Sequence, residues 1–375
     1  MIGRLLGSTT GRQLCLACVS LCFLSPSLAE DTSEDLPPLT LSTVEPPPPI
    51  SPEEPLAGSY SLKRAVRYLD QVALSWQKER KCGTCHTNFA YLMTRPAAAA
   101  VSPPASEVRS FFEDMVKVRW ETKGPRWPAE VVVAATTLAF NDRWSTGKLH
   151  PLTRTALDRM ATLQREDGSW DWLKCGWPPM ESDDHYGVTF AAMGIGAAPE
   201  EYAKTPAAKK MLEGIRKYLK NRPPLSLHHR AMVLWASLLV DGLMTADDRK
   251  KILERLLALQ RPEGGWAIAS LFEDWEAHER KDDEPQDLNT GDGYATGFVI
   301  YLARQMEIAS GDPRLQRGVR WLKANQRQSG RWFTRSPTKD SKHFISNIGT
   351  AYAVLALTSC GETALSPSPS PSQPR

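Results

Sequence analysis

The chain of 375 residues carries almost no net charge, since 46 Lys and Arg face 43 Asp and Glu, for a formal charge of +3 at pH 7. It has no basic run, so it offers no electrostatic case for binding nucleic acid. It also lacks an apolar stretch of the roughly 18 residues that a membrane-spanning helix needs. Phosphate-binding loops, dinucleotide fingerprints and the Gly-x-Ser-x-Gly elbow are absent too. These absences argue against nucleotide-dependent and serine-hydrolase functions.

Cysteine is scarce beyond an N-terminal segment that reads as an export signal. Arg4 and Arg12 supply its positive region, residues 14–24 a short apolar stretch, and residues 27–29 a small-x-small cleavage site. We expect residues 1–29 to be removed and the mature chain to be periplasmic or secreted. Loss of two arginines and no acid then lowers the charge from +3 to +1. Lipoprotein anchoring through Cys18 or Cys22 is a weaker alternative, because neither follows a convincing Leu-small-small box.

One pattern, Gln-x-x-x-Gly-x-Trp, occurs three times, each time just after an amphipathic segment. The copies are residues 164–170, 260–266 and 326–332. Recurrence of rare residue types in fixed register predicts a repeat protein. We expect Gln to end a helix, Gly to supply the turn, and Trp to fold back over the helix ends as a structural staple.

Six pairs of helical segments can be laid out around these turns. The first members are amphipathic and cover residues 61–76, 106–120, 152–164, 206–220, 245–260 and 313–326. The second members are more uniformly apolar and cover residues 86–94, 129–140, 185–197, 226–240, 293–306 and 346–358. Because an amphipathic helix keeps one face in solvent and a helix that is apolar all round is enclosed, we expect an outer ring of helices around an inner ring.

The ends of the chain differ in composition from this repetitive part, which we place at residues 58–361. Residues 30–57 are rich in Pro, Ser, Thr and acids, and are expected to form an extended, disordered linker. Residues 362–375 alternate Ser and Pro and are expected to be a disordered tail.

The repeat turns and helix pairs resemble the α/α toroid of terpenoid cyclases, squalene-hopene cyclases and protein prenyltransferase β-subunits, over about residues 60–360. The resemblance implies an all-α fold, an (α/α)6 toroid, whose apolar centre binds an isoprenoid lipid or similar small molecule where the inner helices begin. It points to the polar residues at these starts: His86, Glu130, Asp183, Asp184, His185, His228, His229, Asp292, Tyr294 and Asn347. His185, His228 and Tyr294 are the residues that we expect to line the cavity. Helix capping is the alternative role for many of these residues, Asp292 and Asn347 above all.

The segment Cys82-Gly83-Thr84-Cys85-His86 has the spacing for covalent attachment of haem c. Two thiols reach the two vinyl groups of one porphyrin, and the adjacent His becomes an axial iron ligand. Export, which this attachment requires, is supplied by the N-terminal segment. Met93 lies on the same helical face as His86, so it is poorly placed as the sixth ligand, which we leave unassigned.

Three other interpretations of this segment remain open. The two thiols can form a redox disulfide, although nothing nearby resembles a thioredoxin unit. They can serve a structural role. They can also bind Zn2+ in a set drawn from Cys82, Cys85, His86, Cys175 and His185.

A second cluster, Glu181-Ser182-Asp183-Asp184, resembles the Asp-x-Asp-Asp motif of class II terpenoid cyclases. The resemblance implies that Asp183 donates a proton to an alkene or epoxide, with Glu181 and Asp184 in support. Carbon is a poor base, so such an acid must be kept protonated in a dry pocket. This chain departs from the motif in having Glu181 where the family has Asp.

The sequence thus favours an exported toroid that binds one c-type haem and has an apolar central cavity, with a redox or sensing role and a redox partner protein. The alternatives are a cyclase-type enzyme that uses Asp183, and a zinc-binding or non-catalytic interaction scaffold.

Overall fold

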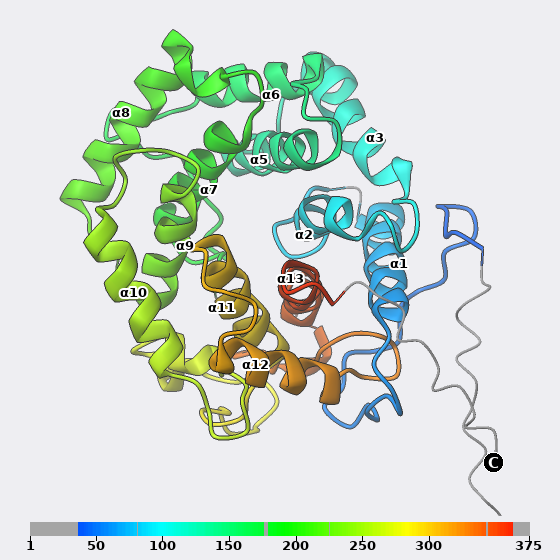
Figure 1. The fold of residues 1–375 in the computed structure, drawn as a ribbon. Coiled ribbons are helices and arrows are strands. Elements are labelled where there is room, and N and C mark those ends of the chain that lie inside the picture. The colour runs from blue at the N-terminus through cyan, green and yellow to red at the C-terminus, as the bar shows by residue number, and fades with distance from the viewer. Residues whose placement is uncertain (1–36, 81, 176–178, 225, 343, 363–375) are drawn as a thin grey trace, which may run out of the picture. The chain divides into compact units, whose positions relative to one another are not determined.

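The computed structural model describes residues 37–362, apart from 81, 176–178, 225 and 343. In these residues six outer helices run around six inner helices (Figure 1). The outer helices are α1 (Leu62–Arg80), α3 (Ser106–Asp114), α6 (Pro151–Thr162), α8 (Pro206–Asn221), α10 (Ala246–Ala258) and α12 (Pro313–Ala324). The inner helices are α2 (Asn88–Thr94), α5 (Pro128–Ser145), α7 (Asp184–Ala197), α9 (Leu227–Ser237), α11 (Gly293–Gln305) and α13 (Ile345–Ser359).

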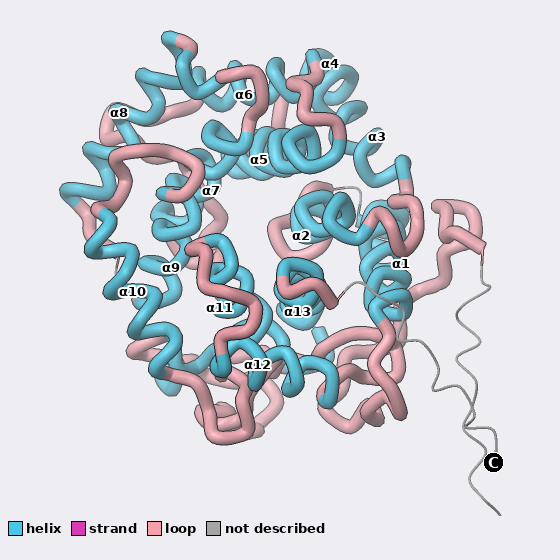
Figure 2. Tube along the Cα trace, in the orientation of Figure 1, coloured by secondary structure: helices cyan, strands magenta, loops and turns pink. Residues whose placement is uncertain are grey.

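The remaining elements are short. A π-helical turn, Met115–Arg119, continues α3 into α4 (Trp120–Lys123), and 3-10 helices cover Arg95–Ala98, Tyr202–Lys204, Ile268–Leu271, Trp275–Ala277 and Asp340–Lys342. The part of the chain that the structure describes holds no named strand (Figure 2). The predicted all-α toroid of six helix pairs is therefore confirmed.

Burial separates the two rings as the hydrophobic patterns predict. In the inner helix α13, every residue from Ile345 to Leu357 is buried. The outer helix α8 buries a single stripe, Ala208, Met211, Leu212, Ile215 and Tyr218. One apolar stripe suffices for a helix that faces solvent, whereas an enclosed helix must be apolar on all sides.

The repeat turns hold neighbouring outer helices together. The Gln164 amide donates to Gly168 O at 3.0 Å and to Met211 O in α8 at 2.9 Å. The buried indole of Trp170 donates to Met160 O in α6 at 2.8 Å. The other two turns repeat these bonds through Gln260, Trp266, Gln326 and Trp332. Stapling by the repeat turns is confirmed.

The third turn closes the ring. Gln326 accepts from Ser61 N at 2.8 Å and donates to Ser61 O at 2.9 Å, just before α1 begins. The end of the last outer helix is thereby bonded to the start of the first. Among the described residues, no helix has the length and apolar character needed to cross a membrane.

Residues 37–57 pack along the ring, which corrects the disordered linker predicted for residues 30–57 as far as the described part extends. Val44 and Ile50 are buried. The guanidinium of Arg331 donates to Pro48 O at 3.1 Å and Pro49 O at 2.6 Å. Proline leaves carbonyl groups without intrasegment partners, and a buried arginine needs acceptors, so the two complement each other. We call residues 37–57 the N-terminal strap.

Candidate functional site

Polar side chains at the starts of several inner helices meet in a buried network. The Tyr186 hydroxyl lies 2.8 Å from His228 Nδ1, and His228 Nε2 lies 2.8 Å from the Tyr294 hydroxyl. These bonds join α7, α9 and α11. His228 and Tyr294 are fully buried, and burial lowers the pKa of His228 well below its ordinary value, so this imidazole is neutral. Of the residues to which the sequence points, His228 and Tyr294 thus lie together in this network.

Aromatic side chains fill the space beside this network, where the resemblance predicts an apolar cavity. Phe298 lies between Trp235 and Tyr352, with ring centroids 6.3 Å and 5.1 Å away. Phe89 packs on Phe140 and Phe190 at 5.9 Å and 4.9 Å. His228 and Tyr294 therefore sit in a packed aromatic core and not on the wall of an open chamber.

The Cys82-to-His86 segment joins α1 to α2, where a Gly-x-Trp turn would otherwise follow Gln77. Cys82 is half-buried, and its carbonyl accepts from the Trp76 indole at 2.9 Å. Cys85 is 1% exposed, and its thiol donates to Glu181 Oε1 at 3.1 Å. Burial, together with the nearby Glu181 carboxyl, raises the pKa of Cys85 well above its ordinary value. Both cysteines are free thiols, and the buried one is held protonated.

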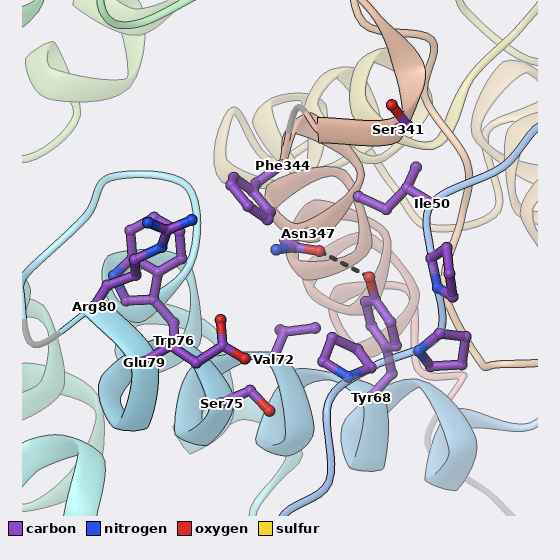
Figure 3. Close-up of a pocket in the computed structure, with 13 residues that line it drawn as sticks. Ile50, Tyr68, Val72, Ser75, Trp76, Glu79, Arg80, Ser341, Phe344 and Asn347 are labelled. Carbon is purple, nitrogen blue, oxygen red and sulfur yellow. Dashed lines mark hydrogen bonds between the residues drawn. The ribbon is translucent and has the colours of Figure 1, made fainter.

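His86 is held by aromatic rings and by a hydroxyl. Its imidazole stacks on Phe344 with centroids 5.1 Å apart, and meets Trp76 edge-on at 5.1 Å. Its Nδ1 atom lies 2.7 Å from Thr87 Oγ1 and 3.4 Å from Thr84 Oγ1. Trp76 and Phe344 also line a pocket of about 140 Å³ between α1, the strap and the start of α13 (Figure 3).

The zinc alternative is not assembled in this structure. Among the described residues, no group of three or more His, Cys, Asp or Glu side chains is arranged to hold a metal ion. Cys175 is exposed and approaches the same Glu181 carboxyl as Cys85. His185 faces the rings of Tyr218 and His229. Cys85 and Cys175 thus share the Glu181 carboxyl, whereas His185 lies among other rings.

The acidic cluster divides into three separate environments. Asp183 caps α7, since Oδ1 accepts from His185 N at 2.8 Å, and Oδ2 lies 3.0 Å from His229 Nε2. Burial opposes its ionisation, but the bonds and charge of His229 outweigh burial and lower the pKa of Asp183. Asp184 pairs with Arg165 and Lys174.

Glu181 is the acid of this cluster with the opposite shift. Burial raises its pKa, with the Cys85 and Cys175 thiols acting against that shift. An acid that protonates carbon has to be held protonated, so the surroundings of Asp183 do not favour that role.

Sequence reasoning missed the residues that surround His86. Trp76 ends an amphipathic segment and Phe344 precedes an inner helix, and neither belongs to a motif. Thr87 directly follows the haem-attachment spacing, which is the one local signal that could have identified it. Tyr68 and Arg331 approach this region only in the folded structure, and no local sequence pattern indicates them.

Comparison with known proteins supports the architecture. No family model matches the chain, and no protein of curated function matches it. A solved glycosidase in complex with glucose is 10% identical, covers 80% of this chain and 98% of its own, and superposes with a TM-score of 0.53. ent-Copalyl diphosphate synthase from Streptomyces platensis is 16% identical over 73% of this chain, with a TM-score of 0.48. The chain spans about half (50%) of that synthase.

A type II terpene cyclase, MstE from Scytonema, is 13% identical, covers 81% of this chain and 99% of its own, and has a TM-score of 0.47. Identities this low show the fold alone. The chain is an all-α toroid of six helix pairs, and this fold does not select a reaction.

Proposed function

We propose that this protein is an exported redox protein that carries one c-type haem on Cys82 and Cys85, with His86 as an iron ligand. The observation that carries the proposal is the position of Cys-x-x-Cys-His in the turn between α1 and α2, where Gln77 is not followed by the Gly-x-Trp staple. A His that binds a metal through one ring nitrogen commonly has the other hydrogen-bonded. An imidazole that binds iron through Nε2 carries its proton on Nδ1, and Thr87 Oγ1, 2.7 Å away, is positioned to accept that proton.

The donor set fits haem c, because two thiols and one imidazole stand in the required order on one short segment. Arg80 stacks over Trp76 at 5.8 Å at the adjoining pocket, and offers a cation for the carboxylates of a porphyrin. The space is smaller than the group, since about 140 Å³ lies below the roughly 300 Å³ at which ligand pockets begin. Attachment therefore requires the Cys85 thiol to leave Glu181 and Phe344 to leave the imidazole.

When bound, the haem would supply one-electron chemistry, and the residues of the chain would hold and tune it. Cys82 and Cys85 would anchor the porphyrin, and His86 would ligate the iron. Met93 lines a pocket with Trp144 and Leu355 that is distinct from the one lined by Trp76 and Phe344. This position supports the expectation that Met93 is not the sixth ligand. A second exported redox protein is the partner that such a function needs.

The cyclase alternative receives no support from the geometry, because Asp183 is held ionised and the aromatic core is packed. A polyprene substrate is therefore no part of the proposed function.

Expression of the full chain together with cytochrome c maturation proteins tests the proposal. We expect the intact mass of the mature protein to rise by one haem, and a pyridine haemochrome spectrum of the thioether-linked type. The double variant Cys82→Ser, Cys85→Ser should lose both signals. Cys360→Ser, which changes a cysteine outside the segment, should keep them.

A colourless protein of unmodified mass, obtained while a known c-type cytochrome is loaded in the same cells, would overturn the proposal.

A further inference from the structure

A buried cation stands at the outer end of a hydrogen-bond path that leads to His86. Arg331 lies between the Gly and the Trp of the third repeat turn, and its side chain is 1% exposed. Its guanidinium pairs with Glu54 of the strap and binds two proline carbonyls. One nitrogen, Nη1, also donates to the Tyr68 hydroxyl at 3.4 Å. An arginine can only donate, so Tyr68 must accept at this contact.

The path continues from α1 through α13 to the haem-attachment segment. The Tyr68 hydroxyl donates to Asn347 Oδ1 at 2.7 Å, a bond drawn in Figure 3. Asn347 Nδ2 donates to Thr87 Oγ1 at 3.4 Å, and Thr87 Oγ1 lies 2.7 Å from His86 Nδ1. Tyr68 is buried at 2% exposure, and burial raises its pKa to about 12, so the hydroxyl keeps its proton for Asn347.

The donors in this path all point the same way. If the Asn347 amide were reversed, Tyr68 would face two donors, Arg331 and Asn347, and its own proton would lose its acceptor. The observed amide orientation therefore follows from the fixed donor at Arg331. Thr87 then accepts from Asn347, and of these two side-chain neighbours only His86 Nδ1 can take the Thr87 proton. A neutral imidazole that accepts at Nδ1 carries its proton on Nε2.

We propose that the chain Arg331, Tyr68, Asn347, Thr87 selects the tautomer of His86 and keeps the Nε2–H form in the haem-free protein. Tyr68 and Asn347 are positioning residues, since neither touches the imidazole. The significance of this tautomer rests on the proposed function, because the Nε2–H form has no lone pair on Nε2 for iron, so the imidazole must change tautomer when haem is attached. Together with the bond from Cys85 to Glu181, the chain keeps two of the three haem donors engaged within the protein until the segment opens.

The substitution Asn347→Asp reverses the path without removing it. A carboxylate only accepts, so it takes the protons of both Tyr68 and Thr87. Thr87 then turns its lone pair toward His86, which must donate from Nδ1 and release Nε2. The expected result is a change of tautomer from Nε2–H to Nδ1–H, with little change in the fold.

Nitrogen-15 NMR of histidine-labelled, haem-free full chain measures the tautomer directly, under mildly alkaline conditions where an ordinary imidazole is neutral. The chain has seven His, so His86→Gln identifies the His86 signals by their loss. In the parent protein, Nε2 should give a protonated and Nδ1 an unprotonated resonance, and Asn347→Asp should exchange them. Asn325→Asp, the same change at the end of α12, should leave them as in the parent.

An Nδ1–H tautomer in the parent protein, or no exchange in a folded Asn347→Asp variant, would overturn the inference. Because the measurement needs no haem, it is independent of the maturation experiment. A failed haem attachment with the predicted tautomers would sink the proposed function and leave the hydrogen-bond chain standing.

Discussion

At the scale of single residues, two aspartates with the same local role have opposite acidities. Asp183 and Asp292 each cap an inner helix by accepting a backbone N–H. Asp183 also has the His229 imidazole at 3.0 Å, which favours the carboxylate. Asp292 is 7% exposed and meets backbone donors only, so burial dominates and raises its pKa to about 7. Capping is thus confirmed as a role of Asp292. Whether the capping carboxyl is ionised depends on its tertiary neighbours.

The raised pKa of Asp292 predicts a pH-dependent loss of stability. Between its ordinary pKa of 3.8 and about 7, the folded chain holds a proton that the unfolded chain has released, so stability falls as pH rises across this window. The fall amounts to at most about 4 kcal/mol, at 1.36 kcal/mol per pKa unit. Urea unfolding from about pH 4 to pH 8 should show this fall in the free energy of unfolding of the parent protein. The free energy of unfolding of Asp292→Asn should depend less on pH.

Asp183→Asn is the matched comparison, because the Asp183 carboxyl should change the stability with pH in the opposite direction. The lowered pKa of Asp183 contributes stability that is present above the unfolded pKa and is lost as pH falls. This variant should therefore lose stability at neutral pH. Parallel profiles for the parent and Asp292→Asn would contradict the assignment.

At the scale of elements, the repeat turns combine a backbone requirement with close packing. Gly168, Gly264 and Gly330 have φ of +92°, +103° and +95°. A Cβ on Gly168 would lie 2.0 Å from Gly214 O in α8, and those on the other two would meet Arg317 O and Arg64 O at 2.8 Å and 2.4 Å. Four residues beyond each of these contacts stands an aromatic residue. These are Tyr218, Trp321 and Tyr68, a repeated position that the sequence pattern did not reveal.

Because of this close packing, substitution of a turn glycine should be more destabilising than its positive φ alone would make it. Gly147 also has a positive φ, +67°, but nothing lies within 4 Å of its Cβ position. Gly147→Ala should cost roughly 1–2 kcal/mol for the left-handed backbone. Gly168→Ala should cost roughly 1–3 kcal/mol more, because α6 and α8 must separate. Denaturant midpoints measure both, and equal costs would show that the packing against α8 is unimportant.

At the scale of the whole molecule, the strap and the third turn close the ring together. Arg331 follows Gly330, and its buried charge is neutralised by Glu54 from the strap. Breaking a buried ion pair from one side leaves the other charge uncompensated, which typically costs about 3–5 kcal/mol. The strap is therefore a structural part of the toroid and not a spacer.

Glu54→Ala should destabilise the entire ring by about 3 kcal/mol or more, because Arg331 is left unpaired. Glu53→Ala, at the exposed neighbouring residue, should stay within about 0.5 kcal/mol of the parent. Chemical unfolding followed by both circular dichroism and tryptophan fluorescence provides the measurement. A small effect for Glu54→Ala, or a local transition seen by one probe only, would contradict a closing role.

The sequence by itself determined the helix pairs, their inner or outer character and the repeat turns, because helical periodicity and the Gln-x-x-x-Gly-x-Trp turn depend on residues close together in the chain. It also marked Cys82 to His86 as a turn in which Gln77 is not followed by Gly-x-Trp. Only the tertiary structure decided how those donors are engaged. Glu181 reaches Cys85 across 96 positions and Asn347 reaches Tyr68 across 279, and contacts at such separations are set by helix packing that no local pattern encodes.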